Sequence, residues 1–329
     1  MSENSPQQLV WMITGCSTGF GRRFVPAILR KGDKVIATAR KLSTIENLAN
    51  EVSEQGLDAS NLKTLELDLE WNTAKLAGVV NEALKVWGRI DVLVNNGGVG
   101  MKSLIEEADA QKFARQFQIN MFGHVDVINS VLPSMRARRS GTILVFGSRS
   151  SWRPELPVRN LKLDDTCYWV LLTSYSSGNC EGLYASSKAA FTAYAETLAT
   201  EIALFSIRVL IVQPSSFRTE NMLTYPYHDD KRIPEYDFLR EKALAGAGSL
   251  HGNQPGDPVK AVELVVDVVR GEGKAKGRKF PRYLPLGSNA GQAIKEKTEM
   301  MKSVLEEWGD IIGSELDYET IGGTKMEYS

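Results

Sequence analysis

The sequence predicts an α/β fold in a single domain: a doubly wound parallel sheet with helices on both faces, followed by a C-terminal helical extension. Two observations carry this prediction. Short apolar runs alternate with segments of helical spacing through most of the 329 residues, which is the pattern of successive β-α-β units. The first apolar run also ends in a glycine-rich turn that opens a helix. Right-handed crossovers between parallel strands then place helices on both faces.

Six strands are expected, because each is a short apolar run that ends at a turn; they cover residues 9–14, 34–39, 62–69, 90–96, 141–148 and 207–214. The segments between them have helical spacing and cover residues 20–32, 42–56, 73–88, 109–139 and 182–205. A further helix over 257–271 starts with Asp257 as N-cap and Pro258 in its first turn. The last predicted helix covers 293–311.

The regularity of this pattern sets the expected domain limits. Residues 8–280 form the predicted catalytic domain, and residues 281–329 form a helical extension with a loose tail. Two stretches break the rhythm. Residues 149–180 have no clear period and are predicted to be an atypical insertion. Residues 220–256 are rich in Pro, Tyr, His and Gly, and are predicted to be a loop or substrate lid.

The composition argues against several classes of protein. The chain has 39 basic and 40 acidic residues and a net charge of −1, so no nucleic-acid or membrane partner is expected. No apolar run is long enough to span a bilayer, and a signal peptide is not expected. The three cysteines lack metal-ligand or disulfide-framework spacing, which favours a reducing compartment and a cytoplasmic location. The histidines are scattered, so no metal site is predicted.

The segment TGCSTGFG, residues 14–21, lies between the first strand and the first helix. A strand–turn–helix aims backbone N–H groups and the positive end of the helix dipole at an anion. Glycine in the turn lets a pyrophosphate approach the backbone. The segment therefore predicts the dinucleotide site of a Rossmann-type fold, with a purely structural tight turn as the alternative.

The second strand ends in VIATARK, with Arg40 and no acidic residue nearby. In dinucleotide folds an acid at this point holds the ribose hydroxyls of NAD, whereas an arginine accommodates the 2′-phosphate of NADP. This residue pattern favours NADP(H) as the cofactor. A solvated surface arginine is the alternative interpretation.

With further motifs in the same order, the chain resembles the short-chain dehydrogenase/reductase family, in its classical form, over residues 9–270. The resemblance rests on the glycine turn and on LELDL, NNGG, QINMFGH, GTILVFGS, YASSK and QPSSFRT. It implies four catalytic residues: Ser148, Tyr184, Lys188 and Asn120. It also implies a set of cofactor-binding residues: Thr14, Gly15, Ser17, Gly19, Phe20, Gly21, Thr38, Arg40, Asp68, Asn95, Tyr184, Lys188, Phe217 and Thr219.

The chemistry of the YASSK pair is consistent with that implication. A carbonyl that gains a hydride needs a proton, and an unperturbed tyrosine has a pKa near 10. Lys188 follows Tyr184 by one helical turn, so its ammonium group can favour the tyrosinate and lower that pKa. Ser148 would hydrogen-bond the substrate oxygen, and Asn120 would anchor a water that leads protons to Lys188.

The chain departs from the family at two places. Pro214 is followed by Ser215 rather than glycine, and the segment between Ser148 and Tyr184 is much longer than the family pattern. One interpretation is a genuine loop beside the active site. Another is a translated, unspliced intron over residues 160–178. Those residues can be encoded by intron donor, branch and acceptor signals over a length divisible by three, and removing them would restore near-family spacing.

Three functions are compatible with these motifs. The leading one is an NADP(H)-dependent oxidoreductase that interconverts a ketone or aldehyde and an alcohol on a hydrophobic small molecule, with a role in secondary metabolism as one interpretation. The first alternative is an NADP-binding protein with little or no catalysis. An epimerase or dehydratase on the same scaffold is less favoured. The resemblance further implies a homodimer or homotetramer built on the tyrosine helix.

Overall fold

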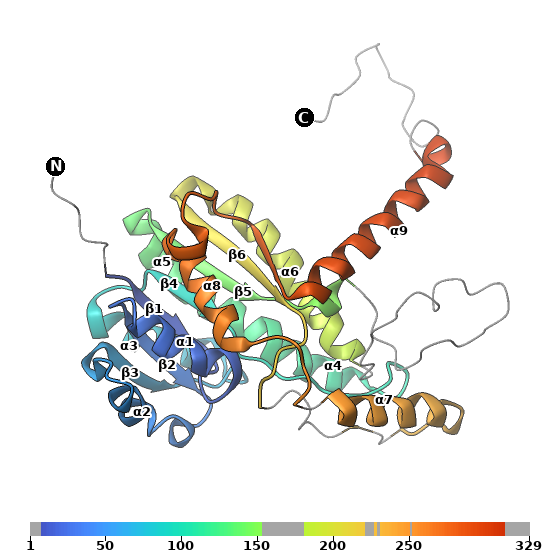
Figure 1. The fold of residues 1–329 in the computed structure, drawn as a ribbon, viewed down its shortest axis with the longest axis horizontal. Helices are drawn as coiled ribbons and strands as arrows, with labels where there is room; N and C mark the ends of the chain where they lie inside the picture. The colour runs from blue at the N-terminus through green and yellow to red at the C-terminus, as the bar shows by residue number, and fades with distance from the viewer. Residues whose placement is uncertain (1–7, 153–180, 221–226, 229–230, 251, 313–329) are drawn as a thin grey trace, which may run out of the picture.

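The computed structural model describes residues 8–152, 181–220, 227–228, 231–250 and 252–312. Seven strands form one parallel sheet in the order β3-β2-β1-β4-β5-β6-β7 (Figure 1). The strands are β1 (Val10–Ile13), β2 (Lys34–Ala39), β3 (Leu62–Glu66), β4 (Val92–Asn95), β5 (Gly141–Phe146), β6 (Ile207–Pro214) and β7 (Tyr283–Leu286). The strand order changes direction between β1 and β4, and ligands bind at such a point in open α/β sheets.

The helices between and after the strands agree with the predicted alternation. They are α1 (Gly19–Leu29), α2 (Leu48–Glu54), α3 (Thr73–Trp87), α4 (Ala110–Phe117), α5 (Gly123–Arg138), α6 (Gly182–Glu201), α7 (Asp237–Leu250), α8 (Pro258–Arg270) and α9 (Ser288–Ile312). Helix α8 starts as expected, because the Asp257 side chain accepts hydrogen bonds from the backbone N–H groups of Val259 and Lys260.

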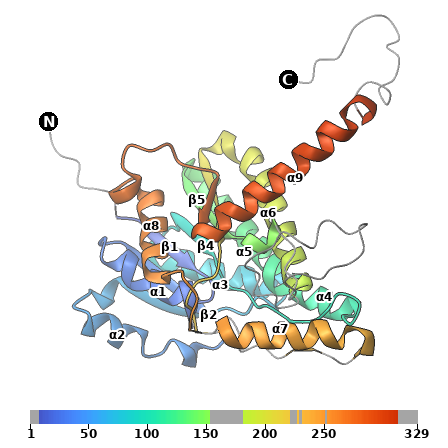
Figure 2. The same ribbon diagram turned by 45° about the vertical axis from the view of Figure 1, so that its right-hand side comes forward.

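Helices cover both faces of the sheet, which confirms the doubly wound fold. Trp11 and Ile13 of β1 point into a core formed with α1, α2 and α8. Val10 and Met12 point into a second core formed with α3, α5 and α6. Side chains of one strand alternate between the faces, so a parallel strand buried on both sides is apolar throughout. Helix α9 leaves the body and projects away from it (Figures 1 and 2).

The predicted helix over 109–139 is continuous but irregular. Helices α4 and α5 are joined by a π-helical turn at Gln118–Phe122, which contains Asn120. π-helical turns inside α-helices are often found at functional sites. The predicted helix over 42–56 is shorter than expected. It consists of a 3₁₀ turn at Leu42–Thr44 and the helix α2, because the Thr44 hydroxyl bonds the Lys41 carbonyl and ends the first turn locally.

The sheet extends past the expected domain end at residue 280. Strand β7 pairs with β6, and Pro285 lies opposite Gln213. The prolines in this segment argue against a strand in the sequence, but a proline is tolerated at a sheet edge, where one side of the strand needs no partner. The C-terminal segment therefore contributes an edge strand before its helix.

The predicted lid, residues 220–256, contains the helix α7 rather than a loop alone. The predicted insertion at 149–180 is described only from Arg149 to Trp152, where Arg149–Ser151 form a 3₁₀ turn. Residues 160–178, for which the intron hypothesis was raised, lie outside the described residues.

Candidate active site

The glycine turn between β1 and α1 is closed by direct backbone contacts. Gly15 and Gly19 have φ angles of +76° and +61°, which side chains rarely adopt. A Cβ atom at Gly21 would lie 2.1 Å from the carbonyl oxygen of Gly15. The start of α1 therefore packs against the turn itself, and only glycine fits there.

Buried side chains brace this turn from below. The Thr14 hydroxyl accepts hydrogen bonds of 3.0 Å from the backbone N–H groups of both Asn96 and Gly97. Thr38 donates its hydroxyl to Ile13 O at 3.0 Å, and the Asn95 amide donates to Leu144 O at 3.0 Å. Thr14, Thr38 and Asn95 are fully buried. The structure thus places these three predicted cofactor residues beneath the turn and the strand ends, where they fix the backbone.

The N-terminus of α1 already holds a carboxylate. The backbone N–H of Gly19 donates to Glu220 at 3.0 Å, and Arg23 donates to both oxygens of the same carboxylate at 2.7 and 3.1 Å. These bonds, that from Arg23 above all, lower the pKa of Glu220 to about 2. The contact shows that this helix end attracts an anion, as its dipole and its orphan N–H groups require.

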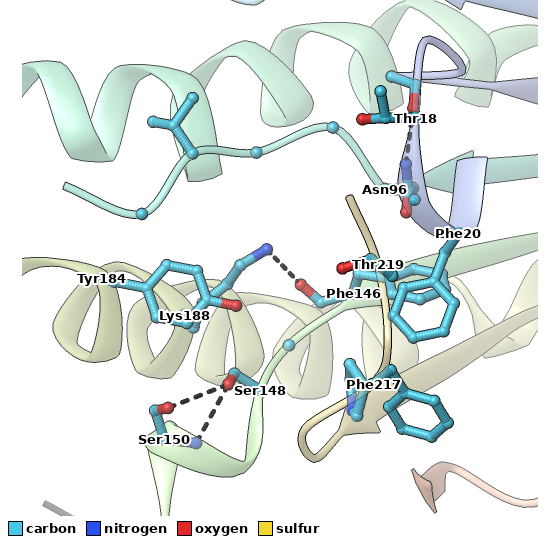
Figure 3. A pocket seen from close by; sticks show the side chains of 18 of the residues that line it. Thr18, Phe20, Asn96, Phe146, Ser148, Ser150, Tyr184, Lys188, Phe217 and Thr219 are labelled. Atoms are coloured by element: carbon cyan, nitrogen blue, oxygen red, sulfur yellow. Dashed lines mark hydrogen bonds between the residues drawn. The ribbon is translucent and has the colours of Figure 1, made fainter. Parts of the chain in front are cut away.

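A cavity of about 370 Å³ opens above the turn, at the carboxyl ends of the strands (Figure 3). It is lined by most of the predicted residues, namely Gly15, Ser17, Gly19, Phe20, Arg40, Ser148, Tyr184, Lys188, Phe217 and Thr219. Arg40 is exposed at the end of β2. Asp68 is half-buried, accepts a hydrogen bond from the Glu70 N–H and does not line this cavity.

Ser148 follows β5 and caps the short 3₁₀ turn. Its oxygen accepts a 3.1 Å hydrogen bond from the Ser150 N–H, and its hydroxyl lies 3.3 Å from the Ser150 hydroxyl. The backbone thus fixes the oxygen, while the hydroxyl proton can rotate toward another acceptor. Because Ser148 and Tyr184 line the same cavity, the long segment between them does not separate them in space.

Lys188 is buried beside Tyr184 on α6. Its Nζ donates to the carbonyl oxygen of Phe146 at 2.7 Å and lies 5.8 Å from the centre of the Tyr184 ring (Figure 3). Burial lowers the pKa of Lys188 to about 8, because removal from water disfavours the charged form. Below that pH the lysine still carries its charge next to the tyrosine.

Asn120 lies in the π-helical turn, beneath the same strand end. Its side chain accepts from the Val99 N–H at 2.9 Å and donates to Val99 O at 3.0 Å and to the Ser187 hydroxyl at 3.1 Å. A Cβ atom at Gly98 would lie 3.1 Å from Asn120 Oδ1 and 3.6 Å from Lys188 Nζ. Asn120 and Lys188 therefore flank one glycine, although Asn120 does not itself line the cavity.

Several residues that line the cavity were not predicted. The cavity is lined by Asn96 rather than by Asn95, and also by Thr18, Ser150 and the segment 97–100. The alternation of side chains along a strand could have predicted Asn96. Asn95 is the last residue of β4 and its side chain bonds within the sheet, so the next side chain along the chain is the one expected to face the cavity. His124 lies below the site, where its Nε2 contacts Gly97 O at 2.7 Å. Burial lowers the pKa of His124 to about 3.

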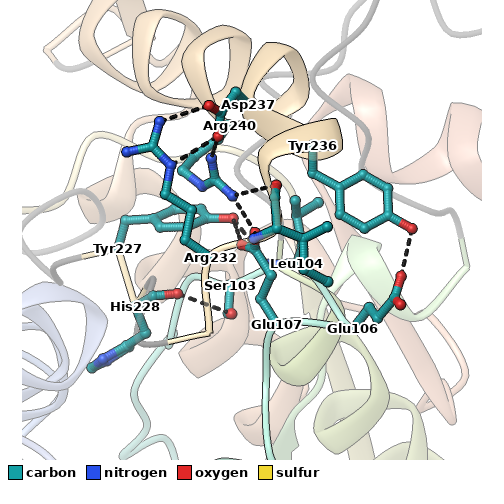
Figure 4. Close-up of polar contacts among 11 residues, drawn as sticks. Ser103, Leu104, Glu106, Glu107, Tyr227, His228, Arg232, Tyr236, Asp237 and Arg240 are labelled. Atoms are coloured by element: carbon teal, nitrogen blue, oxygen red, sulfur yellow. Dashed lines mark hydrogen bonds and ion pairs between the residues drawn. The ribbon is translucent and has the colours of Figure 1, made fainter.

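A polar network holds helix α7 against the loop of residues 103–107 (Figure 4). The buried Glu107 accepts hydrogen bonds from Tyr227 at 3.3 Å and from the Ile233 N–H at 2.9 Å, and it forms an ion pair with Arg240. The neighbouring Glu106 accepts a 2.6 Å bond from Tyr236. The same loop forms a backbone bridge between Ser103 and Glu181, at the start of the tyrosine helix.

Known proteins share this sequence and geometry. A family model described as short chain dehydrogenase matches residues 9–157. "Oxidoreductase claN" of Passalora fulva is 34% identical over 211 residues, which cover 64% of this chain and 83% of that protein. The chain belongs to the short-chain dehydrogenase/reductase family. It is therefore an oxidoreductase of that type, and the family binds a nicotinamide cofactor.

Two further relatives cover nearly the whole chain. "Oxidoreductase BOA17" of Botryotinia fuckeliana is 27% identical over 305 residues, which cover 92% of this chain and 97% of that one. A solved short-chain dehydrogenase from Streptomyces avermitilis is 28% identical, covers 93% of this chain and 98% of its own, and has a TM-score of 0.71. These matches confirm the single α/β domain.

The described residues include no group of three or more His, Cys, Asp and Glu side chains that could hold a metal ion. In the same residues, no helix has the length and apolar character needed to cross a membrane.

Proposed function

We propose that this protein is an NADP(H)-dependent oxidoreductase that interconverts a ketone or aldehyde and an alcohol. The observation that carries the proposal is that Ser148, Tyr184 and Lys188 line one cavity together with the glycine turn. A binding protein without catalysis would need the turn but not these three side chains. Their convergence therefore favours the enzyme over the alternative.

The residues around the cavity fit a dinucleotide. Among the described residues, a Cβ atom at Gly19 would meet only Thr219, at 3.9 Å. The carboxylate of Glu220 at the same helix end shows that the position suits a negatively charged group. Arg40, exposed at the cavity, would hold the 2′-phosphate of NADP. Lys188, Asn96 and Phe217 would surround the ribose and the nicotinamide.

The chain's own residues would donate a proton to the substrate oxygen or accept one from it. The bound cofactor supplies or accepts the hydride, so the protein must give the substrate oxygen a proton or take one from it. Tyr184 is the proposed acid and base, and the Lys188 charge beside it stabilises its anionic form. Ser148 would donate its hydroxyl proton to the substrate oxygen, because the Ser150 N–H already holds its oxygen. Asn120 would keep the segment 98–99 in place beside Lys188.

The aromatic residues of the predicted lid that the structure describes do not line the cavity. Tyr227 and Tyr236 pack against Leu104, Leu239 and Ala243, and their hydroxyls bond the acids of the adjoining loop. A small hydrophobic carbonyl compound stays the proposed class, and a role in secondary metabolism stays a prediction. So do the cytoplasmic location and a homodimer or homotetramer built on α6.

The test compares the protein with its Tyr184→Phe variant. NADPH oxidation is measured against a panel of hydrophobic ketones and aldehydes, and NADPH binding is measured in parallel by calorimetry. We expect turnover by the protein and a loss of about 10³-fold in kcat for the variant, which is the usual range for a positioned general acid. NADPH affinity should stay within about threefold, since the ring remains. NADPH binding without turnover in both proteins would contradict the enzyme and support the alternative.

A further inference from the structure

Helix α9 exposes a large apolar face on its outer half. Every residue from 301 to 312 is exposed. Leu305 and Trp308 are 57% and 51% exposed, and four further large apolar side chains lie in the same half: Met301, Val304, Ile311 and Ile312. Exposed apolar side chains that gather in one patch, rather than singly, mark an interaction surface.

The spacing of these residues places them on one face. Positions 301, 304, 305, 308, 311 and 312 follow the i, i+3, i+4, i+7 pattern of a single apolar stripe. The helix has 25 residues and is about 37 Å long. Among the residues that the structure describes, only Ala290 and Ala293 of α9 are buried, both near its start.

Such a helix needs a partner to be stable. Helices in water owe most of their stability to the packing of an apolar face, rather than to propensity. In Figures 1 and 2 the outer half of α9 extends away from the sheet and its covering helices. Within the described residues, the body therefore packs only against the inner half of the helix.

The charges on α9 identify the partner. Residues 295–302 contain three lysines and two glutamates, whereas residues 303–312 contain three acids and no basic residue. Acids near a helix C-terminus are unfavourable, because the dipole is negative there. A second copy running antiparallel would bring its lysine-rich half opposite this acidic half. A membrane surface fits less well, since helices that lie on anionic bilayers are rich in lysine and arginine.

We propose that α9 is a self-association element that pairs in antiparallel orientation with α9 of a second copy of this chain. The two helices cross near Ser303, so that Met301, Val304 and Leu305 of the two copies pack together and each basic half faces an acidic half. Because the helix projects from the body, the pairing holds the two bodies at opposite ends of the helix pair. This surface is separate from the face of α6 on which the family resemblance predicts an oligomer.

Cysteine trapping on the full chain tests the pairing itself, whatever other interface the protein uses. Val304→Cys lies on the stripe near the middle of the outer half, and Ser303→Cys lies on the opposite side of the helix. Under mild oxidation we expect a disulfide-linked dimer for Val304→Cys in at least tenfold excess over Ser303→Cys. The unsubstituted protein measures the background from its own cysteines. Equal yields from both variants would overturn the proposal.

Charge exchange tests the orientation. Lys295→Glu with Lys297→Glu makes both halves acidic, and Glu307→Lys with Asp310→Lys makes both halves basic. In the Val304→Cys background, we expect each double variant alone to lose at least tenfold in trapped dimer and an equimolar mixture to recover it. A parallel pair would keep its yield in each variant alone, which contradicts the proposal.

Vesicles test the competing partner. Circular dichroism should show the same fold in all variants. Co-sedimentation with phosphatidylcholine–phosphatidylserine vesicles that is abolished by Leu305→Glu would assign the stripe to a membrane instead. Absence of co-sedimentation, together with trapped Val304→Cys dimers, is the expected result.

Discussion

The cofactor side of the cavity and the region around helix α7 are built by different means. The cofactor side, at the ends of β1 and β4, is fixed by backbone contacts between glycines and by buried hydroxyls such as that of Thr14. The α7 region, none of whose described residues lines the cavity, is held by charged side chains, with Glu107 and Arg240 at the centre. Backbone contacts leave a regular motif in the sequence, whereas an ion pair between residues 107 and 240 leaves none. One region is therefore readable from the sequence and the other only from the structure.

The largest effect is expected from a substitution that removes a proposed reacting group and leaves the contacts of both regions intact. Ser148→Ala removes the hydroxyl proposed to bond the substrate oxygen, so kcat should fall by about 10²- to 10³-fold. Ser150→Ala is the matched control, because its backbone N–H, which holds the Ser148 oxygen, remains. Steady-state NADPH oxidation measures both. Equal losses in the two variants would mean that Ser148 acts through the turn and not on the substrate.

The α7 region is weakened by Glu107→Gln. The substitution removes one of the two carboxylates that pair with Arg240, leaves Asp237 as the other, and costs about 2 kcal/mol. We expect faster proteolysis within α7 and a higher KM for the carbonyl substrate, with NADPH affinity unchanged. Glu106→Gln is the control, since Glu106 bonds the exposed hydroxyl end of Tyr236. A matching fall in NADPH affinity would show that the α7 region and the cofactor side of the cavity are not independent.

The cofactor side should respond to acid through His124. Its folded-state pKa of about 3 lies below the ordinary value of 6.5, because the ring is buried. The unfolded chain therefore binds a proton first, and stability is lost as the pH falls below 6.5. Urea unfolding should show about 2 kcal/mol less stability at pH 5 than at pH 7.5 from this residue. His124→Asn should remove that part of the slope, and an unchanged slope would contradict the assignment.

The smallest effect expected is on cofactor choice. Arg40→Ala removes the charge proposed to meet the 2′-phosphate, on the exposed end of β2. We expect the preference for NADPH over NADH, measured as the ratio of the two kcat/KM values, to fall about tenfold, the equivalent of about 1.4 kcal/mol. Substitution of Lys41, the next exposed residue, gives the comparison. If the ratio does not change with Arg40→Ala and changes strongly with substitution of Lys41, the contact with the 2′-phosphate belongs to Lys41 and not to Arg40.

The parts of the fold that could be predicted from the sequence are those that leave a regular pattern in it. Six strands and most helices were predicted because buried parallel strands are apolar throughout and helices have their own period. Strand β7 was missed because its prolines argue against a strand, except at an edge. Asn96 was missed because the resemblance was assigned to Asn95, and the strand pleat decides which of the two faces the cavity.

The lid illustrates the limit most clearly. Helix α7 and its network join residues 103–107 to residues 227–240, which are far apart in the sequence. The sequence pattern of either segment alone does not predict that the two segments are in contact. Of the aromatic residues in the predicted lid, Tyr227 and Tyr236 pack against the helix and hold it in place, whereas Phe238 is half exposed.

The most direct test of the account is to follow the hydride. The protein is incubated with NADPH carrying two deuterium atoms at the reactive carbon of the nicotinamide and with each carbonyl of the panel, and products are analysed by mass spectrometry. We predict an alcohol that gains one deuterium at the former carbonyl carbon with the unsubstituted protein, and about 10³-fold less of it with Tyr184→Phe. Bound NADPH whose deuterium appears in no product of any carbonyl would contradict the claim that this cavity is a hydride-transfer site.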